Sequence, residues 1–369
     1  MPVYFSECPE KDLWRELLQY TYSANIERYF NKKEIIAESE TKNRIIGSFL
    51  QAFNYYKSAS EADIQIAPLL LYYGTSNLLY GTISLISGKN HKINNHGMKL
   101  IMPDDIPFLA NTKIRFFNPS EGGIHVIARE LGFEKDLTKY GDWELIEFLD
   151  SVAEINNDYI RCYNKKTSKI ILLDVFHTPH GMVEKLYYSF DNKDDYLKLF
   201  QDVEKFDNEY LNIANAKDAK SGKEYYVLRH KINGKDISEL SYSGQPYLMA
   251  GHKKESKLIT LTPLLNMYII LFALSSLCRY HPDKWGPFVL NDSTGEKLLF
   301  EKFLFYARRI MPNYVLNIIE GELIQYTSSR YIEKDTVKLV GEHQIEEIVE
   351  HKINKVLRKD NYKKIINKY

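Results

Sequence analysis

The segment LTPLLNMYIILFALSSLCRYHPDKW, from Leu261 to Trp285, decides the fold. Its first part is apolar on every side of a helix, and such a helix is either buried in a protein or spans a membrane. The apolar run Leu261–Cys278 is about 18 residues long, shorter than the roughly 20 that a span needs, and it contains Asn266. We therefore predict a buried core helix and no membrane association.

Composition favours a globular chain with a large core. The 369 residues indicate more than one structural unit, and 44% of them are hydrophobic. Lys and Arg number 49, as do Asp and Glu, so no overall charge attracts nucleic acid. The three cysteines are far apart, which argues against a disulfide framework or a cysteine zinc site. Met1 is followed by no apolar signal region, so we expect a cytoplasmic protein.

Helical spacing of apolar residues predicts helices over Glu10–Tyr20, Ser39–Lys57 and Ala62–Ser87. Gly88 is a typical C-terminal stop for the last of them. That helix carries small residues that would let a neighbouring helix approach closely, namely Gly74, Ser76, Gly81 and Ser84.

The middle of the chain mixes strands and helices. Lys89–Pro119 has the composition of a loop, and Asp142–Ala153 is predicted as a helix capped by Asp142. Lys169–His177 is the clearest strand, and Lys185–Phe190 is its expected partner. The remaining expectations here are a strand over Glu224–His230, a helix over Asp194–Phe206 and a turn at Asn233-Gly234.

After Leu261 the pattern is helical again. Glu296–Ile310 and Tyr314–Gln325 are predicted helices separated by Pro312, and Gln344–Lys359 is strongly amphipathic. We expect a mainly α fold with an α+β insertion, in which the N- and C-terminal helices form one core around a small central sheet. The expected regions are 1–154 (helical), 155–255 (the insertion) and 256–369 (helical).

Three local patterns resemble the YaaC-like family of bacterial proteins. They are LLLYYGTSNLLYGTISL at Leu69–Leu85, the pair His96-Gly97, and LFALSSLCRYHPDKW at Leu271–Trp285. The last matches an aliphatic helix followed by Arg-Tyr-x-Pro-x-x-Trp. The resemblance covers most of the chain, and it implies no established activity.

The helical layout also resembles the HEPN group of helical domains. That resemblance implies a ribonuclease of the kind found in toxins and antiphage defence. Active members of the group carry Arg, then four to six residues, then His. Here a single residue separates Arg279 from His281, and no other Arg has a His at the required distance.

The polar end of the core helix is the first candidate site. Arg279 offers a planar fork for phosphate, Tyr280 and Trp285 offer stacking faces, and His281 can carry a proton near neutral pH. The alternative is an ordinary helix terminus. In that case the cations complement the helix dipole, Pro282 ends the helix and Trp285 packs on the core.

The loop after Ala62–Ser87 is the second candidate. His91 and His96 are suited to ligand binding, and His96 to acting as a base, although polar loops carry such residues anyway. If the terminal helical regions pack together, His96 and Arg279 would share one cleft. A separation above about 15 Å, beyond the reach of one small-molecule pocket, would exclude this hypothesis.

Metal and cofactor sites are not indicated. Asp174, His177, His180 and Glu184 are metal-binding residue types, but Asp174 and His177 point to opposite faces of a strand. The chain has no Walker A, GxGxxG, HExxH or GxSxG motif, so we predict neither a metal nor a cofactor.

The C-terminal tail is basic. Between Lys352 and Tyr369, seven cations face one acid, Asp360. These residues either contact a nucleic acid backbone or form the solvated face of a helix. The candidate nucleic-acid contacts are Lys352, Lys355, Arg358, Lys359, Lys363 and Lys364, followed by Lys368.

Without a catalytic motif, the first functional hypothesis is a binding or regulatory protein. It would recognise a protein partner or a nucleotide-type ligand through the surface around His96 and Arg279, alone or as a homo-oligomer. The alternative is a nucleic-acid-cleaving effector of the HEPN kind, for which a ribonuclease is the leading activity.

Overall fold

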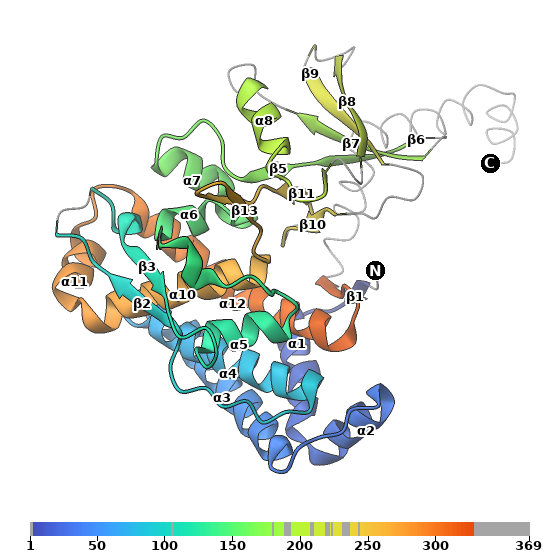
Figure 1. Cartoon of the computed structure of the whole chain (residues 1–369), viewed down its shortest axis with the longest axis vertical. Helices are drawn as coiled ribbons and strands as arrows, with labels where there is room; N and C mark the ends of the chain where they lie inside the picture. The colour runs from blue at the N-terminus through green and yellow to red at the C-terminus, as the bar shows by residue number, and fades with distance from the viewer. Residues whose placement is uncertain are drawn as a thin grey trace, which may run out of the picture. The chain divides into compact units, whose positions relative to one another are not determined.

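A computed structural model describes residues 3–104, 107–178, 181–187, 193–206, 210–217, 222, 224–230, 237–242 and 244–327. The chain divides into two compact units, whose helices and strands are labelled in Figure 1. Unit 1 comprises Met1–Ile170 and Ala250–Thr327, and unit 2 includes Ile171–Met249. The structure is mainly α with small sheets, as predicted. N- and C-terminal helices pack into one core within unit 1, which confirms that part of the expected fold.

Two long antiparallel helices, α3 (Thr41–Glu61) and α4 (Ala67–Ser87), form the N-terminal part of this core. Both were predicted, α3 with a shorter span. A Cβ atom at Gly74 would lie 2.8 Å from the Tyr56 ring, and one at Gly81 would lie 3.0 Å from Phe49. These two glycines therefore allow the expected close approach. Gly88 ends α4 in the left-handed conformation, also as predicted.

The apolar segment forms α10 (Pro263–Tyr280). Thr262 caps its N-terminus, since the Thr262 hydroxyl accepts a hydrogen bond from the Leu265 amide at 3.3 Å. Every residue from Pro263 to Leu277 is buried, as predicted for a core helix. In the described part of the chain, α10 is the single helix long and apolar enough to cross a membrane, and burial in the core accounts for its composition.

Helices from both ends of the chain complete the core. They are α1 (Pro9–Leu18), the 3-10 helix η1 (Gln19–Thr21), α2 (Ser23–Lys33), α11 (Pro282–Asn291) and α12 (Glu296–Glu320). The two predicted helices around Pro312 are one helix, α12. Proline removes a single backbone hydrogen bond. Apolar residues on both sides of it pack on the same core, and this packing outweighs the loss.

The loop predicted over Lys89–Pro119 contains two strands. A three-stranded antiparallel sheet joins β2 (Met98–Ile101), β3 (Lys113–Phe116) and β4 (Asp142–Glu144). Asp142 is therefore a strand residue and not a helix cap. The helix there is shorter, α6 (Leu145–Leu149), and a capping box of Glu144 and Glu147 starts it.

Short elements connect these parts of unit 1. They are α5 (Gly123–Glu130), η2 (Leu109–Asn111), η3 (Leu137–Tyr140), η4 (Ala153–Ile155), α7 (Asn156–Cys162), the hairpin β12 (His252–Lys254) with β13 (Lys257–Ile259), and the parallel pair β1 (Val3–Phe5) with β14 (Gln325–Thr327).

Unit 2 holds an antiparallel sheet of order β6-β7-β9-β8. Its strands are β6 (Asp174–Thr178), β7 (Gly181–Tyr187), β8 (Tyr210–Lys217) and β9 (Glu224–His230), and α8 (Lys193–Phe200) follows β7. The predicted pairing is confirmed where Asp174 lies opposite Lys185, but β7 begins at Gly181 and the single strand predicted over Lys169–His177 is divided between β5 (Ile170–Leu172) and β6. A second sheet has the order β10 (Glu239–Leu240), β11 (Pro246–Met249), β5 (Ile170–Leu172). The Asn233-Gly234 turn and the Gln344–Lys359 helix lie outside the described residues.

Candidate anion-binding site at the end of the core helix

The site is built where α4 packs against α10. Tyr72 and Tyr73, near the start of α4, meet Tyr268 and Arg279 from α10. The Tyr72 and Tyr268 rings stack with their centroids 5.5 Å apart. The contact joins segments that are nearly 200 residues apart in sequence.

A glycine-dependent loop adds His96 to these residues. Gly97 has a φ of +73°, and a Cβ there would lie 2.9 Å from the backbone of Gly122. The close approach allows the Ile124 amide to donate a hydrogen bond to the His96 carbonyl at 3.0 Å. The loop thereby places the His96 ring against Tyr72, with 2.8 Å between Nδ1 and the Tyr72 hydroxyl.

Behind His96 the hydrogen bonds continue into the core. The Tyr72 hydroxyl lies 3.4 Å from that of Tyr268, which lies 3.1 Å from the Ser76 hydroxyl. Burial raises the pKa of both tyrosines, so these hydroxyls stay protonated. Burial, and then the positive charge of Arg279, lower the pKa of His96. His96 is therefore a neutral imidazole at neutral pH.

Arg279 is exposed and lies between two aromatic rings. Its Nη1 donates a hydrogen bond to the Tyr73 hydroxyl. Its guanidinium carbon lies 5.6 Å from the centroid of the Tyr73 ring and 4.6 Å from that of Tyr280. Among the described residues, no carboxylate forms an ion pair with Arg279. Its remaining donors are thus available to an anion.

His96 and Arg279 meet the distance condition for a shared site. The ring centroids of His96 and Tyr73 are 6.4 Å apart, and Arg279 lies 5.6 Å from the same Tyr73 centroid. The sum of these distances, which is an upper limit on the separation, is below about 15 Å. Tyr73 therefore connects the two residues that the sequence analysis singled out.

The other residues of Arg279–Trp285 divide between surface and core. Tyr280 is 60% exposed, whereas Trp285 is 3% exposed and stacks on Phe300. The Trp285 Nε1 donates to the Gln65 carbonyl at 3.2 Å, so this ring anchors α11 and offers no stacking face. His281 starts α11, where its carbonyl accepts from the amides of Lys284 and Trp285.

His91 lies at the opposite end of α4. Its Nε2 is 3.0 Å from the Ser87 hydroxyl, and its Nδ1 is 4.0 Å from Glu130. Ser87 is fourteen residues beyond Tyr73 in α4, about 20 Å along the axis at the usual helical rise. His91 therefore does not join the cluster around Arg279, although it is close to His96 in sequence.

Two sets of predicted residues lie in other parts of the chain than this site. The basic residues from Lys352 onward and His180 lie outside the described residues, as do the side chains of Asp174, His177 and Glu184. In the part of the chain that the structure describes, no three His, Cys, Asp or Glu residues group as metal ligands would.

Three tyrosines of the site, Tyr72, Tyr73 and Tyr268, were not predicted from the sequence. A signal was present in LLLYYGTSN and LLNMYII, because each places tyrosine hydroxyls inside a nearly apolar helix. A buried tyrosine hydroxyl needs a hydrogen-bond partner. The pattern therefore indicated a polar contact between these helices, although not which residue would supply it.

Comparison with known proteins gives one match. The model of a family described as YaaC-like Protein matches residues 10–319, most of the chain. No curated protein and no solved structure matches it. The matched range includes α4, the His96-Gly97 loop and α10, the three elements that form the site.

Proposed function

Because the chain belongs to the YaaC-like protein family, we propose a function in keeping with the site: it is a binding protein for a nucleotide-type ligand. The ligand would bind to the Arg279 surface, which we define as Arg279, Tyr280, Tyr73 and His96. One observation carries the proposal, an exposed guanidinium flanked by two aromatic rings with no described carboxylate to neutralise it.

The side chains of the Arg279 surface would have different roles in binding the ligand. The guanidinium fork suits the paired oxygens of a phosphate group. Tyr280, which is 60% exposed, offers a face on which a base can stack. Tyr73 holds the guanidinium in place through its hydroxyl, which reduces the side-chain entropy lost on binding.

His96 is suited to a polar contact with the sugar or base. Its Nδ1 is occupied by the Tyr72 hydroxyl, whereas its Nε2 has no hydrogen-bond partner among the described residues. Because the pKa of His96 is lowered, its ring would be neutral when a ligand binds near pH 7. We therefore expect His96 to contribute by hydrogen bonding and not by charge.

Calorimetric titration with nucleoside mono-, di- and triphosphates tests the proposal. We expect saturable binding that Arg279→Ala weakens roughly tenfold or more, because hydrogen bonds to charged groups contribute about 1.5–3 kcal/mol each. Arg279→Lys should bind the nucleotides little better than Arg279→Ala does, because lysine lacks the planar fork. Arg161→Ala, at an exposed arginine of α7, is the matched control. No saturable binding, or equal effects of Arg279→Ala and Arg161→Ala, would exclude this function.

A ribonuclease of the HEPN kind is the second candidate, and one observation favours it. Arg279 and His96 both lie close to the Tyr73 ring, so an Arg and a His come together in space without the sequence spacing of that group. Incubation with tRNA tests it, using the wild type beside Arg279→Ala, His96→Ala and His281→Ala. Cleavage lost in the Arg279 and His96 variants would support the enzyme, and intact tRNA under all metal conditions would refute it.

Self-association and nucleic acid binding by the basic tail are tested separately. Light scattering would show whether the chain is a homo-oligomer. Salt-dependent nucleic acid binding that persists after deletion of residues 352–369 would exclude a role for Lys352, Lys355, Arg358, Lys359, Lys363 and Lys364.

A further inference from the structure

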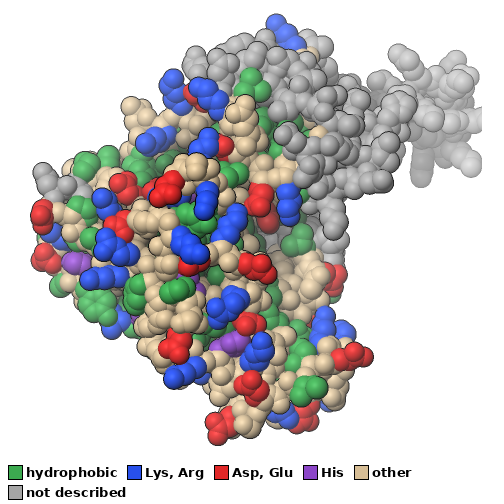
Figure 2. Space-filling view, in the orientation of Figure 1, with side chains coloured by type: hydrophobic (Ala, Val, Ile, Leu, Met, Phe, Trp, Pro, Cys, Tyr) green, Lys and Arg blue, Asp and Glu red, His purple; other side chains and the backbone are tan. Residues whose placement is uncertain are grey.

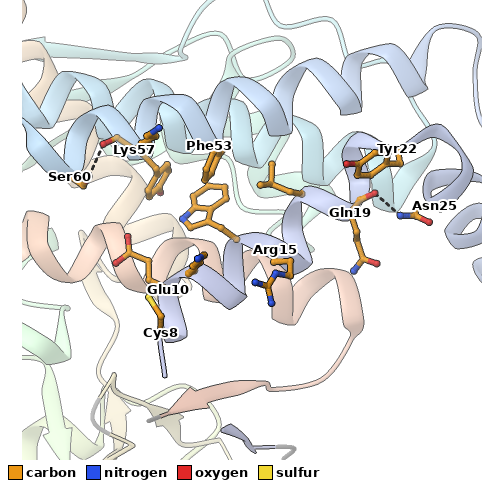
Figure 3. A pocket seen from close by; sticks show the side chains of 13 residues that line it. Cys8, Glu10, Arg15, Gln19, Tyr22, Asn25, Phe53, Lys57 and Ser60 are labelled. Atoms are coloured by element: carbon orange, nitrogen blue, oxygen red, sulfur yellow. Dashed lines mark hydrogen bonds between the residues drawn. The ribbon is translucent and has the colours of Figure 1, made fainter. Parts of the chain in front are cut away.

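A separate groove lies on the N-terminal helices of unit 1, between α1, η1 and α3 (Figure 3). Its volume is about 770 Å³. Trp14 and Leu18 line it from α1, and Phe53 and Tyr56 line it from α3. The Trp14 ring centroid lies 5.5 Å from that of Phe53 and 5.0 Å from that of Tyr56. Trp14 and Tyr56 are buried, so the half-buried Leu18 and Phe53 offer the apolar surface that a ligand can reach. Pockets of about 300–1,000 Å³ with such walls are typical of small-molecule sites.

A second, polar hollow adjoins this groove. It has a volume of about 270 Å³, and Gln19 and Asn25 line both. Three cations of α2 line the hollow, Arg28, Lys32 and Lys33. Arg28 Nη1 donates to the Asn25 side chain at 3.0 Å, which directs the guanidinium toward the junction of the two spaces.

The charges around both spaces are unbalanced. The groove is also lined by Lys11, Arg15 and Lys57, whereas one acid lines each space, Glu10 in the groove and Glu320 in the hollow. Glu10 lies 3.7 Å from Arg308, which offsets its charge. Glu320 accepts a hydrogen bond from the Tyr20 hydroxyl at 3.2 Å and keeps its negative charge, so the three cations of the hollow exceed its acids by two.

Of the cations that line the groove, Arg15 forms an ion pair with Asp12 at 3.1 Å. Among the described residues, Lys11, Lys57, Lys32 and Lys33 form no ion pair. On a chain with equal numbers of positive and negative residues this is a local excess of positive charge. Elsewhere Lys and Arg alternate with Asp and Glu over the face drawn in Figure 2.

We propose that the groove and hollow together bind one amphipathic organic anion. Its apolar body would lie along Leu18 and Phe53, and its anionic head would lie in the hollow against Arg28, Lys32 and Lys33. An uncharged apolar molecule would not contact the cations, and a bare phosphate would leave the exposed parts of Leu18 and Phe53 in water. This site is independent of the Arg279 surface, and either proposal can fail without the other.

A pair of matched probes tests the proposal on the full chain. The anion 8-anilinonaphthalene-1-sulfonate and the uncharged N-phenyl-1-naphthylamine share one aromatic body and differ by the sulfonate. Both fluoresce more strongly in an apolar site. We expect saturable binding of both, with the anion bound roughly tenfold more tightly, because three surface charges each contribute up to about 1 kcal/mol.

Two variants separate the parts of the site. The triple variant Arg28→Gln, Lys32→Gln, Lys33→Gln should weaken binding of the anion roughly tenfold and change binding of the uncharged probe by less than about twofold. Leu18→Trp, which fills the groove, should weaken the binding of both probes. Lys99→Gln on β2 is the control for charge and should affect neither. Circular dichroism and thermal melting check that each variant is folded.

Three results would overturn the proposal. One is a lack of saturable binding by the wild type, and another is binding of the anion that neither variant weakens. The third is a dimer, detected by sedimentation, that the Leu18→Trp and triple variants dissociate while the wild type binds no probe. That last result would assign the groove to a second copy of this chain.

Discussion

Gly97→Ala is the most direct test of how the loop positions His96. Gly97 adopts a φ of +73°, a conformation that an L side chain rarely adopts. An added Cβ would lie 2.9 Å from the Gly122 Cα and 3.1 Å from its carbonyl carbon. Both are backbone atoms held by the hydrogen bonds of the Asn95–Ile124 contact, so neither can move aside alone.

The expected loss in the free energy of unfolding has two contributions. The left-handed conformation costs alanine roughly 1–2 kcal/mol. Carbon atoms normally approach to about 3.5–4.0 Å, and forcing a methyl group into a filled space costs about 1–3 kcal/mol. We therefore expect Gly97→Ala to lower the free energy of unfolding by about 2–5 kcal/mol and to weaken ligand binding at the Arg279 surface, because His96 is displaced.

Gly132→Ala is the matched control. Gly132 has a φ of +84°, but an added Cβ meets no atom within 4 Å. Gly132→Ala should lower the free energy of unfolding only by the cost of the left-handed conformation, about 1–2 kcal/mol, and should leave ligand binding unchanged. Urea unfolding of both variants measures the difference. Equal losses of stability, or normal ligand binding by Gly97→Ala, would refute the role given to the Gly97–Gly122 contact.

Three further predictions concern the described core. Burial, and then the charge of Lys169, lower the pKa of His252, so its stabilising contribution is complete above pH 6.5 and is lost as the pH falls. Urea unfolding at pH 6.5 and 5.5 should show a loss of up to about 1 kcal/mol that His252→Gln lacks, and parallel pH dependences would contradict this. Glu296 is 1% exposed and accepts hydrogen bonds from the amides of Leu109 and Ala110 and from the Tyr163 hydroxyl. Glu296→Ala should therefore cost about 2–4 kcal/mol in urea unfolding, against less than about 0.5 kcal/mol for Glu301→Ala on the same helix. Trp285→Ala should cost about 3–5 kcal/mol, whereas Tyr280→Ala should leave the melting temperature nearly unchanged and weaken nucleotide binding. Equal melting temperatures for these two variants would contradict the buried position of Trp285.

The long elements were predictable because their signals are local. The uninterrupted apolar run of α10 and the small residues of α4 indicate a buried helix and a close helix contact whatever the rest of the chain does. Elements with weaker local signals were missed. In α2 the described core residues are Ile26 and Phe30 alone, too few for a clear period. Both strands β2 and β3 have four residues.

The sequence alone therefore determined that α4 and α10 are core helices and that Arg279 ends one of them beside aromatic residues. The tertiary structure decided which residues share the site. It joins Tyr73 and His96 to Arg279, places His91 at the other end of α4, and buries Trp285. The physical reason is that periodicity records which face of a helix is buried. The partners of that face depend on how helices far apart in the chain cross, and on one backbone contact between Gly97 and Gly122.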